Sequence, residues 1–167
     1  MDDETPPVWS RSEVRVGGFL HAIPLGRGQE YGGVDLSAEL LLPRPSLWTG
    51  SFWRSFAPRP DIGFALNFDH KTSYAYVGGA WTASFERAWF VEPAVGLAVH
   101  NGKFDAPLGQ DRLSLGCNPV FRLAFSAGYR ITPRWALTAS MEHLSNGGLC
   151  SPNQSLNEVG PRLSLAF

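Results

Sequence analysis

Residues 134–157 read R-W-A-L-T-A-S-M-E-H-L-S-N-G-G-L-C-S-P-N-Q-S-L-N, and this segment decides how the rest of the chain is interpreted. Its first half alternates between apolar and other side chains, as expected of a β-strand, whose successive side chains point to opposite faces. The apolar positions are Trp135, Leu137, Ala139 and Met141. His143 and Ser145 continue the same face, and a Gly-rich polar loop follows. A base and a hydroxyl that extend an apolar stripe favour an enzyme with an apolar substrate.

Seven further segments show the same two-residue period, and turn residues separate most of them. They span residues 14–23, 34–42, 62–69, 73–85, 89–100, 121–129 and 156–167. With the strand in 134–157, they predict eight strands in one domain of residues 13–167, after an N-terminal arm of residues 1–12. Pro93 and Pro161 each remove a backbone donor from their strands, so we expect a β-bulge at both positions.

The predicted strands have one apolar face and one face of polar or small side chains. The polar positions include Asp35, Glu39, Asn67, Asp69, Glu92, Arg122, Ser126, Thr138, Glu142 and Ser164. A soluble barrel would bury the apolar face, whereas charged side chains can pair inside the narrow interior of an eight-stranded membrane barrel. Aromatic residues stand at strand ends beside the short turns, as in an interfacial girdle: Trp89, Tyr129, Trp135 and Phe167. The sequence therefore predicts an all-β, eight-stranded antiparallel transmembrane β-barrel of the outer-membrane type.

Composition speaks against several other classes of protein. The net charge is −1 and charged residues make up 17%, which disfavours a nucleic-acid-binding surface. The sequence has no run of about 20 apolar residues that would form a transmembrane helix. The N-terminus, M-D-D-E-T-P-P, lacks the apolar core of a signal peptide, and we expect the export signal of an outer-membrane protein to have been removed before it.

Cys117 and Cys150 are the two cysteines of the chain. With the short turns facing the periplasm, the extracellular loops are residues 24–33, 70–72, 101–116 and 147–155. Cys117 then begins a strand just after one outer loop, and Cys150 lies in the next outer loop. Because both stand at the same end of neighbouring hairpins in an oxidising compartment, we expect a disulfide between them.

His143 and Ser145 are two residues apart on a strand, so their side chains point the same way. A serine hydroxyl becomes a nucleophile when a neighbouring base takes its proton, and histidine is the usual base at neutral pH. Such a pair also needs a group that fixes the imidazole tautomer and donors that stabilise an oxyanion. The following loop offers donors at Asn146, Gly147, Gly148 and Asn153. Polar groups that face hydrocarbon are costly, so we expect this pair to be functional.

The sequence H-L-S-N-G-G-L-C-S-P-N of residues 143–153, together with Leu156 and a last strand that ends on an apolar residue, resembles the lipid A 3-O-deacylase (PagL) family. Members of this family are eight-stranded outer-membrane barrels that hydrolyse the ester-linked acyl chain at the 3-position of lipid A without a metal. The specific match is confined to the C-terminal segment, and elsewhere the resemblance lies in barrel pattern and length. It implies an ester hydrolase of the outer membrane that acts on lipopolysaccharide.

The resemblance also implies roles for individual residues. Ser145 resembles the family's nucleophile, and His143 resembles its general base. Gly148, through its backbone N–H, and Asn153, through its side chain, resemble the oxyanion hole. Asn146 follows the family's Ser-Asn pair and, with Gly147, is expected to support the loop.

The third member of the triad departs from the family pattern. The family has a Glu at the position that is Asn157 in this sequence, and Glu158 follows one residue later. Strand parity places Asn157 on the face of His143, whereas Glu158 points into the lumen unless a bulge shifts the register. Two interpretations stay open: the Asn157 amide oxygen orients His143, which the parity favours, or a shifted Glu158 does so with a carboxylate. Glu142 lies on the wrong face and is expected to pair with a lumen Arg such as Arg122.

The sequence leaves three functions open. The first is removal of the 3-O-linked acyl chain from lipid A by a Ser/His esterase. The second is a non-catalytic outer-membrane barrel, which the Asn at the carboxylate position supports, and the third is a soluble lipid-binding barrel. We expect lipopolysaccharide and membrane lipids as partners, no nucleic acid, and no metal or other cofactor. The oligomeric state stays open, a homodimer included.

Overall fold

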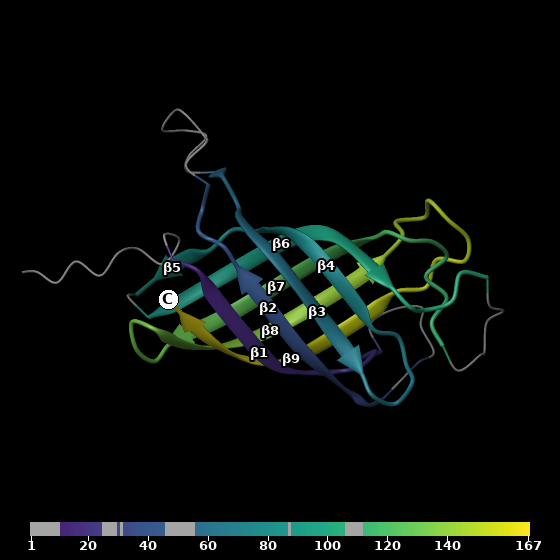
Figure 1. Ribbon diagram of the computed structural model, residues 1–167, viewed down its shortest axis with the longest axis horizontal. Coiled ribbons are helices and arrows are strands. Elements are labelled where there is room, and N and C mark those ends of the chain that lie inside the picture. The colour runs from purple at the N-terminus through teal and green to yellow at the C-terminus, as the bar shows by residue number, and fades with distance from the viewer. Residues whose placement is uncertain (1–10, 25–29, 31, 46–55, 87, 106–111) are drawn as a thin grey trace, which may run out of the picture.

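The computed structural model describes residues 11–24, 30, 32–45, 56–86, 88–105 and 112–167, which form a closed antiparallel β-barrel (Figure 1). The strands are β1 (Glu13–Leu20), β2 (Val34–Leu41), β3 (Arg59–Asn67), β4 (Tyr74–Ala80), β5 (Ala83–Phe85), β6 (Trp89–His100), β7 (Val120–Arg130), β8 (Trp135–Ser145) and β9 (Leu156–Ala166). β1 pairs with β9, and β4 pairs with β6, which closes the ring. Because β4 and β5 both pair with β6, they count as one strand, and the predicted eight-stranded barrel is confirmed. Most of the expected N-terminal arm, residues 1–10, lies outside the described residues.

The two strand prolines interrupt their ladders without a bulge, so the expected bulges are wrong. β4 ends with Ala80 opposite Ala94, and β5 begins with Ala83 opposite Val91, so the register is the same on both sides of Pro93. The gap between β4 and β5 lies opposite Pro93, which has no N–H to donate. The pairing of β1 with β9 shows a similar gap opposite Pro161, again with the register kept.

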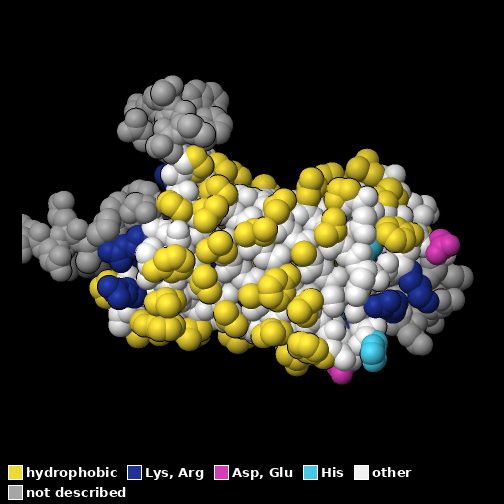
Figure 2. Space-filling model, in the orientation of Figure 1, with side chains coloured by type: hydrophobic (Ala, Val, Ile, Leu, Met, Phe, Trp, Pro, Cys, Tyr) yellow, Lys and Arg dark blue, Asp and Glu magenta, His cyan; other side chains and the backbone are white. Residues whose placement is uncertain are grey.

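The outer wall of the barrel is apolar. Large hydrophobic side chains of β3, β4, β6, β7, β8 and β9 are about half exposed, among them Ile62, Val77, Leu97, Leu123, Phe125, Leu137 and Leu163. Figure 2 shows hydrophobic side chains spread over the visible face of the barrel, with Lys and Arg gathered towards its two ends. Trp89 and Tyr129 meet edge to face at one end of the band, with ring centroids 4.9 Å apart. A soluble lipid-binding barrel, with its apolar face inside, is therefore wrong.

Among the described residues, no helix is long and apolar enough to cross a membrane.

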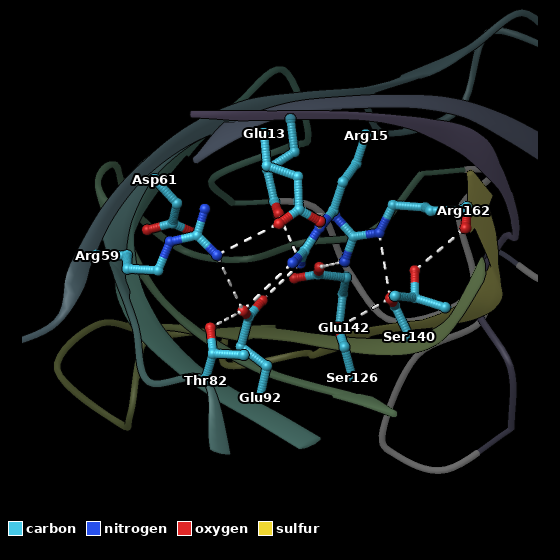
Figure 3. Close-up of polar contacts among 12 residues, drawn as sticks. Glu13, Arg15, Arg59, Asp61, Thr82, Glu92, Ser126, Ser140, Glu142 and Arg162 are labelled. Atoms are coloured by element: carbon cyan, nitrogen blue, oxygen red, sulfur yellow. Dashed lines mark hydrogen bonds and ion pairs between the residues drawn. The ribbon is translucent and has the colours of Figure 1, made fainter. Parts of the chain in front are cut away.

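Ion pairs occupy much of the barrel interior, beside a cluster of buried apolar side chains. Four arginines from four strands are at most 1% exposed: Arg15, Arg59, Arg122 and Arg162. We call these arginines and their carboxylate partners the arginine layer. Arg122 Nε lies 2.6 Å from Glu142 Oε2, as expected for a lumen charge pair. Arg162 Nη1 lies 2.7 Å from Glu39 Oε2, and Figure 3 shows further contacts of the layer. Paired and hydrogen-bonded charges can fill a buried lumen, since each desolvated ion has a partner.

Candidate active site

β8 places His143 and Ser145 on the outward face of the barrel, near its loop-bearing end. The preceding residues of β8 alternate strictly, with Met141 exposed and Glu142 buried, and His143 and Ser145 are half-buried on the outward side. In the register with β7, His143 stands opposite Leu123 and Ser145 opposite Phe121. The predicted polar pair is thus flanked by apolar wall.

Asn157 is the group that contacts His143. The register of β8 and β9 sets the two residues directly opposite each other. His143 Nδ1 lies 2.7 Å from Asn157 Oδ1, and His143 Nε2 lies 3.1 Å from Ser145 Oγ. An amide oxygen accepts only, so Nδ1 carries the proton in this contact and Nε2 keeps a lone pair for the serine hydroxyl. The arrangement is that of a nucleophile, a base and an orienting group.

Ser155 fixes which end of the Asn157 amide faces His143. Asn157 Nδ2 donates to Ser155 Oγ at 3.3 Å, which leaves Oδ1 for the imidazole. The sequence interpretation did not include Ser155, although it lies two residues before Asn157 and the strand period could have indicated it. Asn157 is 3% exposed, and its backbone oxygen accepts from Ile23 N at 2.8 Å.

Glu158 lies on the other side of the wall. It is fully buried, and it accepts a hydrogen bond from Tyr74 OH at 2.9 Å across the lumen. β9 keeps its register through this position, with Glu158 opposite Glu142, so no bulge turns the carboxylate outward. Of the two candidate third members, the structure brings Asn157 and not Glu158 to His143.

Hydrogen bonds within the loop after Ser145 engage the Gly148 N–H donor and the Oδ1 acceptor of Asn153. Gly148 N donates to Asn146 Oδ1 at 2.8 Å, and Asn146 N donates to Asn153 Oδ1 at 3.2 Å. Gly147 and Gly148 both have positive φ, at 64° and 84°, which explains the Gly-Gly pair because other residues are strained there. The Gly148 N–H is therefore engaged inside the loop and reaches an oxyanion only by leaving or sharing Asn146.

The Asn146 side chain ties this loop to its neighbour. It is 1% exposed, and its Nδ2 is 2.8 Å from Leu115 O and 3.0 Å from both Cys150 O and Pro152 O. Cys150 forms the expected disulfide with Cys117, three residues before β7, with the Cα atoms 6.1 Å apart. The loop is thus held at Asn146 and at Cys150. The disulfide was expected from the topology of the hairpins, whereas the Asn146 contacts were not.

The fold and the site define an outer-membrane β-barrel that carries a Ser–His–Asn hydrogen-bond chain on its lipid-facing wall. The protein belongs to the lipid A 3-O-deacylase (PagL) family, whose model matches residues 31–166 of its sequence. It is accordingly an integral protein of the outer membrane. No curated protein matches it in sequence.

Several solved structures share the barrel. The crystal structure of the outer membrane enzyme PagL superposes with a TM-score of 0.61 at 17% identity and covers 94% of this chain and 99% of that chain. A de novo designed transmembrane β-barrel gives 0.58 at 14% identity, with 95% and 96% covered. The Yersinia pestis outer membrane protein Ail gives 0.52 at 11% identity, with 95% and 99% covered. At these identities the structures support the fold alone.

Proposed function

We propose that this protein removes the 3-O-linked acyl chain from lipid A by ester hydrolysis, with Ser145 as the nucleophile and His143 as the general base. The observation that carries the proposal is the hydrogen-bond chain from Ser145 through His143 to Asn157 on the lipid-facing wall. Membership of the lipid A 3-O-deacylase family supports the substrate class.

The chemistry follows from the two ends of the imidazole. Nε2 takes the proton of Ser145 as Oγ attacks the carbonyl carbon of the acyl ester. The imidazolium formed keeps its Nδ1–H on Asn157 and gives the Nε2 proton to the leaving sugar oxygen. A water molecule then attacks the acyl-enzyme, again with His143 as base, and the fatty acid leaves as the proton returns to Ser145.

The negative charge that develops on the carbonyl oxygen needs donors, and Gly148 N–H and the Asn153 amide are proposed to supply them. Gly148 N–H rests on Asn146 Oδ1 before substrate binds. An oxyanion is a stronger acceptor than an amide oxygen, so the developing charge favours a shift of this N–H towards the substrate. The loop would then be complementary to the transition state and not to the ester itself.

The outward position of the pair suits a substrate whose acyl chains lie in the membrane. Phe121, Leu123 and Met141 surround the pair on the wall and are 45%, 53% and 38% exposed. An acyl chain can lie on these side chains while its ester group remains at the level of Ser145. The ester then reaches the nucleophile without leaving the outer leaflet.

Mass spectrometry of lipid A tests the proposal. The protein, folded in detergent and incubated with lipid A, is expected to release one hydroxyacyl group, and Ser145→Ala is expected to abolish this loss. Ser84→Ala, an exposed serine on β5, is the matched control and should retain activity. Mass loss that persists in Ser145→Ala contradicts the nucleophile assignment. No mass loss with the unaltered chain favours a non-catalytic barrel, which the Asn at position 157 would then explain.

A further inference from the structure

The lumen contains a second group of buried acids that has no arginine partner among the described residues. We call His21, Glu30, Asp35 and Glu158 the histidine cluster; their side chains are at most 1% exposed. Among the ion pairs of the described residues, these three carboxylates have one basic partner, His21. The arginine layer, in contrast, sets guanidinium groups between its acids (Figure 3). Buried carboxylates without enough positive charge favour the binding of a cation.

The acidic oxygens converge on one nitrogen of His21. Nδ1 lies 2.6 Å from Asp35 Oδ2 and 3.3 Å from Glu158 Oε1. One ligand atom from each of the three residues lies within 4.8 Å of the other two. Atoms that are about 2.0–2.2 Å from a shared metal ion are separated by roughly 3–4.4 Å, so small movements would bring the three atoms around one ion.

The remaining oxygen of each carboxylate is held by a neutral donor. Asn67 Nδ2 donates to Asp35 Oδ1 at 2.5 Å, and Tyr74 OH donates to Glu158 Oε2 at 2.9 Å. Asp35 Oδ2 and Glu158 Oε1 are therefore the oxygens that face His21 Nδ1. Glu158 Oε1 is buried without a hydrogen-bond partner. Metal-binding carboxylates are commonly oriented in this way by hydrogen bonds to their second oxygen.

Glu30 completes the arrangement on the far side of the imidazole. Its carboxylate accepts from Thr72 N, Thr72 Oγ1 and Leu113 N, and Glu30 Oε2 stands 3.5 Å from His21 Nε2. His21 Nε2 is buried and has no hydrogen-bond partner. When Nδ1 binds a metal, Nε2 carries the proton and points at Glu30. A carboxylate behind the second nitrogen is the usual support of a metal-binding histidine.

We propose that the histidine cluster binds one divalent transition-metal ion, Zn²⁺ or Mn²⁺, through His21 Nδ1, Asp35 Oδ2 and Glu158 Oε1. An imidazole nitrogen with two carboxylates suits these ions better than Ca²⁺ or Mg²⁺, which prefer oxygen ligands alone. The ion takes no part in ester hydrolysis, because Glu158 points into the lumen while Asn157 points to the wall. It would join the end of β1 to the starts of β2 and β9, and so hold the strand that presents Asn157.

Metal binding is measured on a chain without a histidine tag, folded in detergent and stripped with EDTA. Isothermal titration with Zn²⁺ or Mn²⁺, with metal content read by mass spectrometry after gel filtration, is expected to give one ion per chain. Glu158→Gln, which removes one ligand at constant size, should weaken binding at least about tenfold. The matched control is His100→Gln. His100 is the last residue of β6, at the loop-bearing end, and its Nε2 contacts Cys117 O and not a carboxylate.

Two results would overturn the proposal. One is the absence of stoichiometric Zn²⁺ or Mn²⁺ in the unaltered chain, which would leave a proton shared with His21 as the cation of the cluster. The other is equal affinity in Glu158→Gln and His100→Gln, which would place the ion elsewhere. Each variant is checked for folding by its heat-dependent migration on gels, and Asp35→Asn replaces Glu158→Gln where that variant does not fold.

Discussion

Replacing Asn157 by Asp is expected to raise the rate of lipid A deacylation, because the group that orients His143 gains a negative charge at constant size. The contact to be changed is the 2.7 Å hydrogen bond from His143 Nδ1 to Asn157 Oδ1. A hydrogen bond between neutral groups contributes about 0.5–1.5 kcal/mol, and one to a charged group about 1.5–3 kcal/mol. The difference of roughly 1–1.5 kcal/mol, realised as the imidazolium forms, corresponds to a rate gain of about 5- to 10-fold.

Asn157→Ala gives the opposite change at the same position. Without an acceptor, the imidazole is free to place its proton on Nε2, where it cannot act as a base towards Ser145. We expect a loss of at least about 10²-fold, as for removal of general-base catalysis. The assay is the initial rate of 3-hydroxy fatty acid release from lipid A in mixed micelles at saturating substrate.

Asn101→Asp is the matched control for the charge change. Asn101 also lies at the loop-bearing end, but its Oδ1 accepts from Ser73 N and not from His143. Its rate should equal that of the unaltered protein. Equal rates for the unaltered chain, Asn157→Asp and Asn157→Ala, all folded, would refute a role of Asn157 in orienting His143.

Three further outcomes follow from the loop and the wall. Reduction of the Cys117–Cys150 disulfide should leave the barrel folded but lower its free energy of unfolding by about 3–4 kcal/mol, because the unfolded chain regains the entropy of a loop of 33 residues. Urea unfolding with and without reductant measures this difference. Asn146→Ala should lower kcat more than about tenfold with unchanged gel migration, because the loss of its buried amide frees the loop that carries the oxyanion donors; unchanged kinetics would contradict this. Phe125→Arg, in the middle of β7 on the lipid-facing wall, should cost about 2–4 kcal/mol in vesicle unfolding experiments, whereas Ile131→Arg in the turn after β7 should cost about 0–1 kcal/mol.

The strands were predictable because each follows one rule. In β7, outward Phe125 alternates with inward Ser126, and a period of two is set by backbone geometry alone. The gap between β4 and β5 was not predictable in the same way. The gap depends on which residue of β6 stands opposite. Pro93 has no N–H to donate, so it interrupts the neighbouring strand and leaves its own strand, β6, continuous.

The two-residue period also predicted that His143 and Ser145 point outwards and that Asn157 lies on the same face. The register of β8 and β9 then sets His143 directly opposite Asn157. The loop bonds of Asn146 could not be predicted, because they depend on turn geometry that brings Leu115 beside it. The histidine cluster was also outside the reach of sequence spacing. His21, Asp35 and Glu158 are brought together by three strands that meet only when the barrel closes.

A neutral orienting group has a consequence for a site that faces hydrocarbon. A carboxylate at position 157 would be a nearly fully buried charge on the membrane side of the wall, where desolvation is costly. The Asn157 amide is neutral, and both of its polar atoms are hydrogen-bonded. Its Oδ1 accepts from His143, and its Nδ2 donates to Ser155. The imidazolium then forms next to a dipole, which stabilises it less than a charge does. Asn157→Asp should therefore raise the rate and lower the free energy of unfolding together, and a variant that gains rate without losing stability would show that the carboxylate is solvated.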